Sequence, residues 1–541
     1  MTQRYNILSI LSIVFIGLVV LYPSLDIYFV SDNIGHIEHA AKNVTLLDYR
    51  YFRPLTIASL WLDLQIWGAN FTGYHITNLV LHIIMSVTVY LLAIMMVRSR
   101  FFGLSAAFFF LLHPIHSLDI FWISGRTDMI CGIFYISSLL FFIRYFKTED
   151  LRYNFASILL FLLALLSKEM AVSLPLVALV YAFVFEEGHF RVRVREAFRL
   201  SSVFWLVLIA YLVFRYLNIG DAAFSNADHN LANPLLLFKN LAIYLGLLVI
   251  PGGHIEIAQY FQANPMAFAV AAIAAILVLV FSAGLFRRSR LLFFTLMFTL
   301  ITLLPVLRLV MRWYLYIPSV GICLGLAYLL YLANRSKRRI FVLSYGGVLL
   351  VCWIYAMFLM TDQRRWIEAG NLSREYTGKV AATIAEKQLR SCYLLNVPGE
   401  LAEVPVNMFG LGSFLNFRLR HEFNYSDSVS VKRISYLSLA SEDDFRKQVA
   451  HKTGENEYEL ALFQTGAHYF FPKRTDLQRI AFSKGMVIEE PDFQQEILEV
   501  NDRKLPVQLI VRMKNMGDPV LIFRDSEVVV ALPDSMVVKN P

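Results

Sequence analysis

Long apolar runs recur along this chain, and they constrain its fold more than any other feature. Runs near 6–26, 73–97 and 128–147 each contain about 20 residues with few charges. About 20 helical residues cross the ~30 Å hydrocarbon layer of a membrane. Apolar residues make up 57% of the sequence and charged residues 17%. Soluble domains are about 25% charged. We therefore predict a multi-spanning α-helical membrane protein.

Basic clusters separate the apolar runs and predict their orientation. The clusters lie at Arg4 and within 98–100, 144–152, 191–199, 287–290 and 335–339. They contain 17 of the 26 Lys and Arg residues before position 362, so the positive-inside rule places them in the cytoplasm. Eleven spans alternate correctly with them: 6–26, 73–97, 101–117, 128–147, 153–167, 170–186, 199–218, 265–286, 291–307, 313–334 and 340–361. The N-terminus is then cytoplasmic and the C-terminus extracytoplasmic.

The predicted membrane domain, 1–361, contains two long outer loops at 27–72 and 219–264. Segment 153–186 reads as two short helices broken at Ser167-Lys168-Glu169, with one long tilted helix as the alternative. The apolar stretch near 235–250 would invert the next basic cluster if it crossed the membrane, so we expect a re-entrant or surface helix there. The net charge of +8 arises within the membrane domain, which argues against nucleic-acid binding.

The sequence changes character after Trp366, and a mixed α/β domain is predicted for 366–541, on the extracytoplasmic side. Residues 373–390 read as a polar helix, and 441–451 as a helix that opens with a Ser441–Asp444 capping signal. Strand-like runs occupy 392–397, 427–439, 458–463, 507–513 and 519–532.

Ionisable and polar side chains gather on the outer side of the predicted membrane domain. Such groups are costly at membrane depth and indicate a functional site. The set comprises Asp32, Glu38, Arg53, Asp63, His75, Asn78, His82, His113, His116, Asp119, Arg126, Asp128, Lys168, Glu169, Arg215, Arg308, Arg312 and Tyr314. A one-sided set favours an outward-facing reaction chamber. A lipid or solute transporter of the envelope, which needs groups near the midplane, is the alternative function.

Individual residues allow more than one interpretation. Asp32 suits a general base, although Ser-Asp-Asn also begins helices. The four histidines with Asp119 match no established metal spacing, so a divalent metal is left open. Cations at the outer interface suit a lipid phosphate, although terminal Lys and Arg also extend to lipid headgroups. These cations are Arg126, Lys168, Arg308 and Arg312.

Five segments of the membrane domain resemble one protein family. They are YRYFRPLTI (49–57), GYHITNLVLH (73–82), LLHPIHSLDIFWISGRTDM (111–129), LLSKEMAVSLP (165–175) and RWYLYIPSVGIC (312–323). They look like the membrane half of the transmembrane-and-tetratricopeptide-repeat O-mannosyltransferases. More widely, the chain is similar to the GT-C glycosyltransferases, including the protein O-mannosyltransferases. No tetratricopeptide repeat follows the membrane part, and Leu118 then Asp119 stand where the family places a Glu.

The resemblance implies a membrane glycosyltransferase, a hexosyltransferase of which mannosyltransferase is the first candidate. It implies inverting transfer of a sugar from a polyprenyl-phosphate donor to an extracytoplasmic hydroxyl of a protein, lipid or glycan. Asp32 would be the base, and Arg126, Lys168 and Arg312 would contact the donor phosphate. The expected partners are membrane lipids, the lipid-linked donor and the acceptor, and the expected location is the plasma membrane, a bacterial inner membrane.

Overall fold

The computed structural model describes most of the 541 residues. It leaves undescribed 1–2, 43–51, 220–233, 250–263, 265, 267–269, 271–272, 274–283, 285–287, 336–337, 403, 408–409, 426, 435, 440–448, 455–456, 462–468, 471–482, 490, 501–505, 515–517, 525–526 and 532–541. The chain divides into two compact units. The first contains Met1–Leu25, Ala40–Gly68 and Gly73–Gln363, and the second contains Asp26–His39, Ala69–Thr72 and Arg364–Pro541.

The first unit is helical. Its helices include α1 (Gln3–Leu21), α3 (Pro54–Trp67), α4 (Phe71–Val97), α5 (Arg100–Leu112), α6 (Ser117–Phe121), α7 (Arg126–Thr148), α8 (Leu151–Leu165), α9 (Leu174–Phe185), α10 (Phe190–Ile219), α11 (Pro234–Val249), α14 (Arg290–Leu303) and α15 (Pro318–Asn334). Short 3-10 turns join them: η1 (Tyr22–Asp26), η2 (Pro114–His116), η3 (Ile123–Gly125), η4 (Glu169–Ser173), η7 (Leu304–Val306) and η8 (Arg312–Leu315). Helices α2 (Asn33–Lys42) and α16 (Arg338–Glu386) have residues in both units.

The first unit has the composition of a multi-pass membrane domain. Five described helices are long and apolar enough to cross a membrane, or six if the bent pair α5 and η2–α6 forms one span. Four more predicted spans coincide with shorter apolar helices, near 151–165, 169–185, 290–306 and 318–334. Most of the predicted span 265–286 lies outside the described residues. The count of eleven spans therefore stays a prediction.

Proline accounts for the bend in the third predicted span. Helix α5 ends at Leu112, and His113 takes an extended conformation (φ −64°, ψ 119°) before Pro114. A residue before proline is disfavoured in the helical region, and proline has no N–H for the helical ladder. The chain resumes as η2 and α6 at an angle of 43°. This bend brings a polar segment, 113–119, into the helical unit.

The predicted break near Ser167-Lys168-Glu169 is confirmed. Helix α8 ends at Leu165, Lys168 is extended (φ −160°, ψ 146°), and α9 begins at Leu174 with Pro175 in its first turn. Two short helices therefore replace the single tilted helix that was the alternative. The break turns the Lys168 side chain away from a helical ladder and into the protein, where it is buried.

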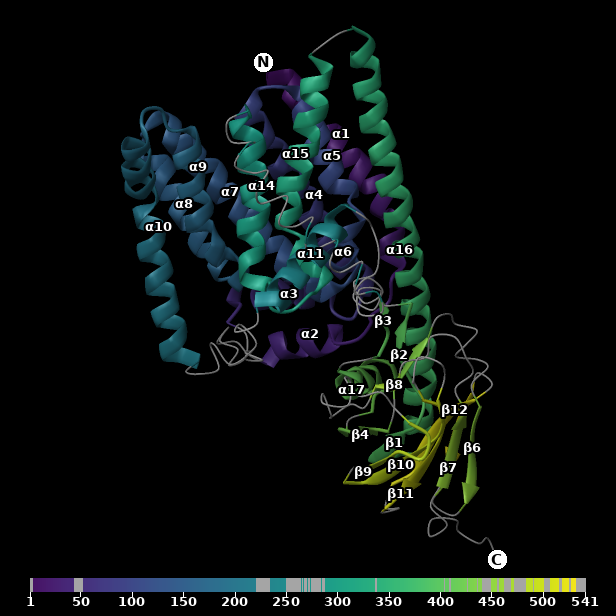
Figure 1. Ribbon diagram of the computed structural model, residues 1–541. Coiled ribbons are helices and arrows are strands. Elements are labelled where there is room, and N and C mark those ends of the chain that lie inside the picture. The colour runs from purple at the N-terminus through teal and green to yellow at the C-terminus, as the bar shows by residue number, and fades with distance from the viewer. Residues whose placement is uncertain are drawn as a thin grey trace, which may run out of the picture. The chain divides into compact units, whose positions relative to one another are not determined.

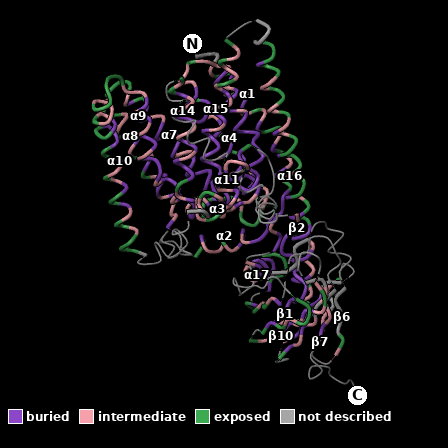
Figure 2. The backbone as a smooth tube through the Cα atoms, viewed as in Figure 1, coloured by how far each residue is buried: buried purple, intermediate pink, exposed green. Residues whose placement is uncertain are grey.

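Helices of the first unit pack side by side around an apolar core. Contacts join α5 to α1 and α15, α14 to α9 and α15, and α7 to α8, an arrangement visible in Figure 1. Exposed apolar side chains such as Phe15, Leu206 and Trp353 lie on α1, α10 and α16. Figure 2 shows exposed stretches along α10 and α16. An apolar outer surface of this kind requires an apolar surrounding, which a bilayer supplies.

The second unit contains three sheets. Their strands are β1 (Ser391–Leu394), β2 (Val397–Leu401), β3 (Val404–Pro405), β4 (Ser430–Arg433), β5 (Tyr436–Leu439), β6 (Val449–Gly454), β7 (Glu457–Ala461), β8 (Tyr469–Phe470), β9 (Val487–Glu489), β10 (Phe493–Val500), β11 (Pro506–Met513), β12 (Val520–Arg524) and β13 (Glu527–Ala531). The strand orders are β13-β12-β1-β4, β6-β7-β11-β10-β9 and β3-β2-β5-β8. Strand β1 is parallel to both neighbours, whereas the five-stranded sheet is antiparallel.

All five predicted strand runs of the tail contain strands, because alternating and β-branched residues mark them. The helix predicted at 441–451 is wrong at its end, since residues 449–451 open β6, and 440–448 lie outside the described residues. Helix α17 (Leu411–Glu422) was not predicted. Helix α16 is also longer than expected, because it runs unbroken for 49 residues through the predicted span 340–361 and most of the predicted polar helix.

Gly321 sets the close approach of α15 to α14, and this predicts a difference between two glycines. A Cβ at Gly321 would lie 2.5 Å from the Thr295 carbonyl oxygen, whereas one at Gly346 would meet nothing within 4 Å. Gly321→Ala should lower the free energy of unfolding by about 1–3 kcal/mol through overpacking. Gly346→Ala should leave it unchanged or raise it slightly. Thermal unfolding of both detergent-solubilised variants measures this, and equal midpoints would contradict the packing.

Candidate active site

Four cations of the first unit are each paired with a carboxylate from another segment or a neighbouring helix. The pairs are Arg126–Asp63, Lys168–Asp128, Arg53–Glu169 and Arg312–Asp362. An unpaired charge is expensive to bury, so pairing is the condition under which these groups enter an apolar unit. We call these eight residues, together with Asp119, the ionic cluster.

Arg126 occupies the most enclosed position of the cluster. It begins α7, its side chain is 0% exposed, and its Nη1 lies 2.6 Å from Oδ2 of Asp63 on α3. Its Nε donates to Oδ1 of Asn78 on α4, at 3.1 Å. The Ile123 carbonyl shares the Nε hydrogen, and the Ser59 and Tyr74 carbonyls accept from Nη1 and Nη2. Protein groups therefore hold every nitrogen of this guanidinium.

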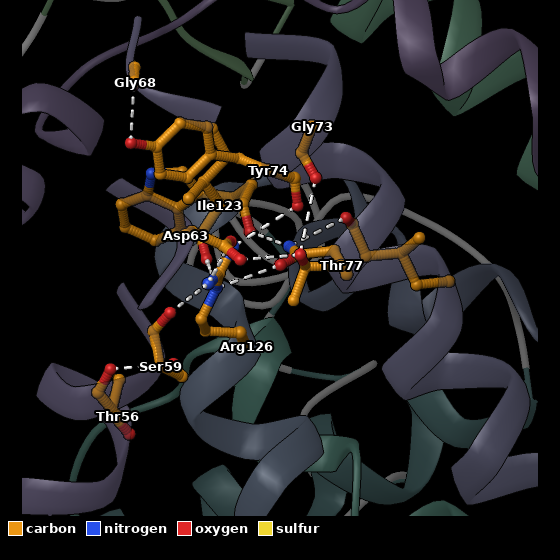
Figure 3. Close-up of polar contacts among 12 residues, drawn as sticks. Thr56, Ser59, Asp63, Gly68, Gly73, Tyr74, Thr77, Ile123 and Arg126 are labelled. Atoms are coloured by element: carbon orange, nitrogen blue, oxygen red, sulfur yellow. Dashed lines mark hydrogen bonds and ion pairs between the residues drawn. The ribbon is translucent and has the colours of Figure 1, made fainter. Parts of the chain in front are cut away.

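The partners of Arg126 are themselves fixed. The Thr77 hydroxyl donates to Oδ1 of Asp63 at 2.7 Å, and the Asn78 amide donates to the carbonyls of Ile120 and Trp122. These bonds connect α3, α4 and the turn before α7, as Figure 3 shows for Asp63, Thr77 and Arg126. The geometry favours a bracing role for Arg126 and Asn78.

Lys168 forms a second buried pair. Its Nζ lies 2.6 Å from both oxygens of Asp128, and the two side chains are 3% and 5% exposed. The same Nζ is 4.9 Å from the ring centre of Tyr314 in η8, within range of a cation–π contact. The break after α8 thus places the Lys168 ammonium against the first turn of α7 and against η8.

Arg53 and Glu169 form the most open pair of the cluster. The Arg53 Nη2 and Nε donate to the two Glu169 oxygens at 2.5 and 3.2 Å, in the two-pronged geometry that suits arginine and a carboxylate. Their side chains are 20% and 37% exposed. Burial favours a lower pKa for Arg53, but the Glu169 carboxylate outweighs it and raises that pKa above its ordinary value.

Arg312 joins η8 to α16 and keeps one donor unused. Its Nη2 donates to Oδ2 of Asp362 and to the Pro114 carbonyl, both at 2.6 Å. Asp362 also accepts from the Ser117 hydroxyl at 2.8 Å. Within the described residues, the Arg312 Nε is buried without a hydrogen-bond partner. Arg312 is thus anchored at one side of its guanidinium and available at another.

Asp119 is the carboxylate that has no matching cation. It lies on α6, it is 0% exposed, and neither of its oxygens has a hydrogen-bond partner in the described part of the chain. The charges of Asp128, Lys168 and Arg312 act on it. Gly125 permits this position, because a Cβ there would lie 2.6 Å from the Asp119 carbonyl oxygen. Buried polar groups are nearly always bonded, so this exception marks a candidate binding group.

Two of the predicted histidines form buried hydrogen bonds to neighbouring elements. The His82 Nε2 donates to the Leu111 carbonyl at 3.1 Å, and its Nδ1 lies 2.9 Å from the Tyr316 hydroxyl. The Ser319 hydroxyl donates to the Tyr316 carbonyl, so it accepts from Nε2 of His116, at 2.8 Å. The His116 Nδ1 is buried and has no hydrogen-bond partner among the described residues.

The remaining histidines are buried as well. His113 accepts from the Ile115 N–H through Nδ1, and its Nε2 donates to the Leu248 carbonyl at 3.3 Å. His75 is 1% exposed on α4. Where the structure describes the chain, no group of three or more His, Cys, Asp or Glu side chains is arranged to hold a metal ion. Hydrogen bonds of His82, His113 and His116 join α4 to α5, the N-cap of η2 to α11, and η2 to α15.

Asp32 and Glu38 lie in the second unit. Asp32 directly precedes α2, its side chain is 23% exposed, and its Oδ2 lies 3.1 Å from Nε2 of His36. Glu38 is paired with Arg420 on α17. Asp32 is thus reachable from solvent, whereas most carboxylates of the ionic cluster are not.

The structure brings most predicted site residues of the first unit together. Arg308 differs, since it is half-buried outside the four pairs, and its carbonyl accepts from Asn240. Sequence reasoning missed Asp362, Ser319 and His36 as contact residues. Asp362 had a usable signal, because it is the first acid after a long apolar run. Ser319 had none, because a serine in an apolar helix is ordinary.

No protein-family model matches the chain. Protein O-mannosyl-transferase Tmtc1 of Drosophila melanogaster is 31% identical over 122 residues, which is 23% of this chain and 14% of that protein. Protein O-mannosyl-transferase tmtc2 of Xenopus laevis is 26% identical over 215 residues, 36% of this chain and 26% of that protein.

The chain is similar to the protein O-mannosyl-transferases. The predicted resemblance is confirmed, although the alignments span about a quarter or less of those two relatives' length. Two solved structures also align with most of this chain. ArnT from Cupriavidus metallidurans, bound to undecaprenyl phosphate, gives a TM-score of 0.42 at 17% identity and covers 80% of this chain and 86% of that one. The Archaeoglobus fulgidus oligosaccharyltransferase gives 0.41 at 13%, with coverage of 73% and 62%.

The Arg126–Asp63 pair predicts a large stability effect. Arg126→Gln leaves the Asp63 carboxylate buried without a cation, so the free energy of unfolding should fall by about 3–5 kcal/mol. Arg152→Gln is the matched control. Its pair with Asp150 has an arginine side chain that is 92% exposed, and such surface pairs contribute about 1 kcal/mol or less. Thermal unfolding in detergent compares them, and similar midpoints for both variants would contradict the bracing role.

Asp119 predicts a gain of stability on substitution. Asp119→Asn removes a buried carboxylate whose oxygens have no hydrogen-bond partner in another described residue, so thermal stability should rise. Asp362→Asn removes a carboxylate that Arg312 and Ser117 bind, so its stability should fall. Thermal unfolding of both variants in detergent tests this. A loss of stability in Asp119→Asn equal to that in Asp362→Asn would show that Asp119 is structural.

Proposed function

We propose that this protein is a membrane glycosyltransferase that moves a sugar from a polyprenyl-phosphate donor to a hydroxyl outside the cytoplasm. The observation that carries the proposal is the ionic cluster, in which Asp119 and the Arg312 Nε are buried and unsatisfied among the described residues. Buried polar groups are usually hydrogen-bonded, and a polar substrate would supply the missing partners. The similarity to proteins named O-mannosyl-transferases supports the same class.

The donor phosphate is proposed to bind at the cations of the cluster. Arg312 supplies a free Nε beside an anchored guanidinium, and Lys168 supplies a point charge. Both suit a phosphate, and the low-dielectric surroundings strengthen the attraction. Arg308 is a further proposed contact at the edge of the cluster. Arg126 is proposed to act indirectly, since its donors are occupied within the protein.

Asp32 is proposed as the general base. Its exposed fraction of 23% leaves the carboxylate accessible to an acceptor, and His36 is placed to orient it. In the proposed step, Asp32 takes the proton of the acceptor hydroxyl as that oxygen attacks the anomeric carbon. The bond from that carbon to the phosphate oxygen breaks, and its electron pair leaves with the polyprenyl phosphate. One displacement inverts the anomeric configuration.

The names of the relatives guide the choice of substrates. Protein O-mannosyl-transferases point to mannose as the first sugar to test and to Ser or Thr hydroxyls of a protein as the first acceptor. The proposed location is the plasma membrane, a bacterial inner membrane, with the second unit outside the cytoplasm. Bilayer lipids and the lipid-linked donor are then the constant partners.

Asp32→Asn tests the base. General-base catalysis contributes about 10²–10⁴-fold, so transfer from polyprenyl-phosphate mannose to a Ser/Thr peptide should slow by that factor. Donor binding should remain within about twofold, because the phosphate contacts are elsewhere in the proposal. The assay is transfer of radiolabelled mannose by purified protein, with donor affinity measured separately.

Asp26→Asn is the matched control. Asp26 is an exposed carboxylate six positions earlier in the same segment, and its change should leave the rate near that of the unmodified protein. Retention of near-full activity in Asp32→Asn would exclude Asp32 as the base. Flux of the lipid or solute across vesicles without formation of a glycosidic bond would instead support the transporter.

A further inference from the structure

The segment that contains Asp32 is part of the C-terminal unit. Asp26–His39 groups with Arg364–Pro541, although more than 300 residues of sequence separate them. This short segment contacts α16, the region after β3, and α17 through backbone, aromatic and ionic groups. These contacts matter because a base is effective only when it is held in position.

Aromatic side chains attach the segment to α17. The Tyr28 ring stacks on Phe414 at a centroid distance of 6.0 Å, and Phe29 meets the edges of Phe414 and Phe417 at 6.3 and 6.4 Å. Phe71 packs against both Tyr28 and Phe29. All of these distances lie in the range of favourable ring pairs, each of which contributes about 0.5–1.5 kcal/mol beyond burial.

Two arginines close over the same tyrosine. The guanidinium carbons of Arg374 and Arg418 lie 5.4 and 5.6 Å from the Tyr28 ring centre. Arg418 is fixed by Glu422 through two bonds of 2.6 and 2.8 Å, and by Thr377 on α16 at 2.8 Å. Burial raises the pKa of the Tyr28 hydroxyl, so the ring stays neutral and suited to cation–π contact. Tyr28 is therefore an anchor, four residues before Asp32.

The backbone at Asp32 is fixed directly by the segment after β3. Ser31 has φ +52°, a strained left-handed conformation for a serine, and its N–H donates to the Val406 carbonyl at 2.6 Å. Gly410 has φ +68°, and a Cβ there would lie 3.2 Å from the Asp32 Cα. Only glycine fits such an approach without displacing the neighbour. Val406 and Gly410 thus determine where the Asp32 backbone lies.

An ion pair holds the far end of the segment. Arg420 on α17 pairs with Glu38 on α2, whose side chain is 14% exposed. The Asp32 carbonyl accepts from the His36 N–H at 2.9 Å, which continues the first turn of α2. Asp32 therefore lies between two anchors, Tyr28 on one side and Glu38 on the other, and both attach to the C-terminal unit.

We propose that the C-terminal α/β domain positions the Asp32 base, with Val406, Gly410 and α17 as the positioning elements. This inference rests on the proposed function, since it takes Asp32 as the base. It assigns the domain a role in the chemical step that is separate from donor binding. Displacing a reacting group by about 1 Å costs about 10²-fold in rate. Changes at the positioning elements should therefore lower kcat and leave the donor KM nearly constant.

Gly410→Ala and Gly485→Ala form the decisive pair. Both replace a glycine with positive φ, +68° and +79°, in the same unit, but a Cβ at Gly485 would meet nothing within 4 Å. Gly410→Ala should lower kcat for mannosyl transfer, because the Asp32 backbone must move to accept the Cβ, with the donor KM within twofold. Gly485→Ala should retain kcat. Equal kcat values for the two folded variants would overturn the inference.

A charge exchange provides a second test that does not depend on backbone strain. Glu38→Arg should lower kcat, and adding Arg420→Glu should restore much of the loss by re-forming the pair with reversed signs. Amide hydrogen exchange of peptide 26–39 should be faster in Gly410→Ala and in Glu38→Arg than in the unmodified protein. In the double variant Glu38→Arg/Arg420→Glu it should return to the unmodified rate. Unchanged exchange in both single variants would contradict the docking.

The failure of this inference is distinguishable from failure of the proposed function. If Asp32→Asn transfers mannose at the unmodified rate, the base assignment fails and the positioning role with it. If Asp32→Asn is inactive while Gly410→Ala is folded and fully active, the base assignment stands and the positioning role fails.

Discussion

Pairing of buried charge is the constraint on which the first unit depends. Arg126 and Lys168 are almost fully enclosed, and each is tolerable there only because a carboxylate lies 2.6 Å away. These pairs join α3 to α7 and the α8–α9 break to α7. Charge pairing therefore helps to fix the register of these helices, which apolar packing specifies less sharply. The apolar exterior provides the setting in which such pairs are strong.

The ion pairs also show which groups of the cluster have no partner. Five carboxylates and four cations make up the ionic cluster, so Asp119 lacks a counterpart while Arg312 retains an unused Nε. A protein selected for stability alone would replace such an acid by an amide or an apolar residue. The surplus acid and the unused donor are the groups to which we propose that a sugar phosphate binds, because its hydroxyls can donate to the carboxylate and its phosphate can accept from the Nε.

Much of this architecture could be predicted from sequence, for physical reasons that differ between elements. Apolar runs and Lys168-Glu169 predicted the spans and the break between α8 and α9, because hydrocarbon thickness and buried charge act locally. The pairing of Arg126 with Asp63 could not be predicted, since no local pattern records which helices meet. Nor could the grouping of Asp32 with α17, since helix 411–422 carries no strong capping signal and its partners are distant in sequence.

The anchoring of Tyr28 on Phe414 has a consequence for biosynthesis. The two residues are 386 positions apart, and at about 5–20 residues per second a ribosome needs roughly 20–80 s to pass from one to the other. During that interval Tyr28 and Phe29 lack the part of their docking surface that α17 supplies. The segment Asp26–His39 can therefore complete its packing only after α17 has been made, which makes this packing a late step in the folding of the chain.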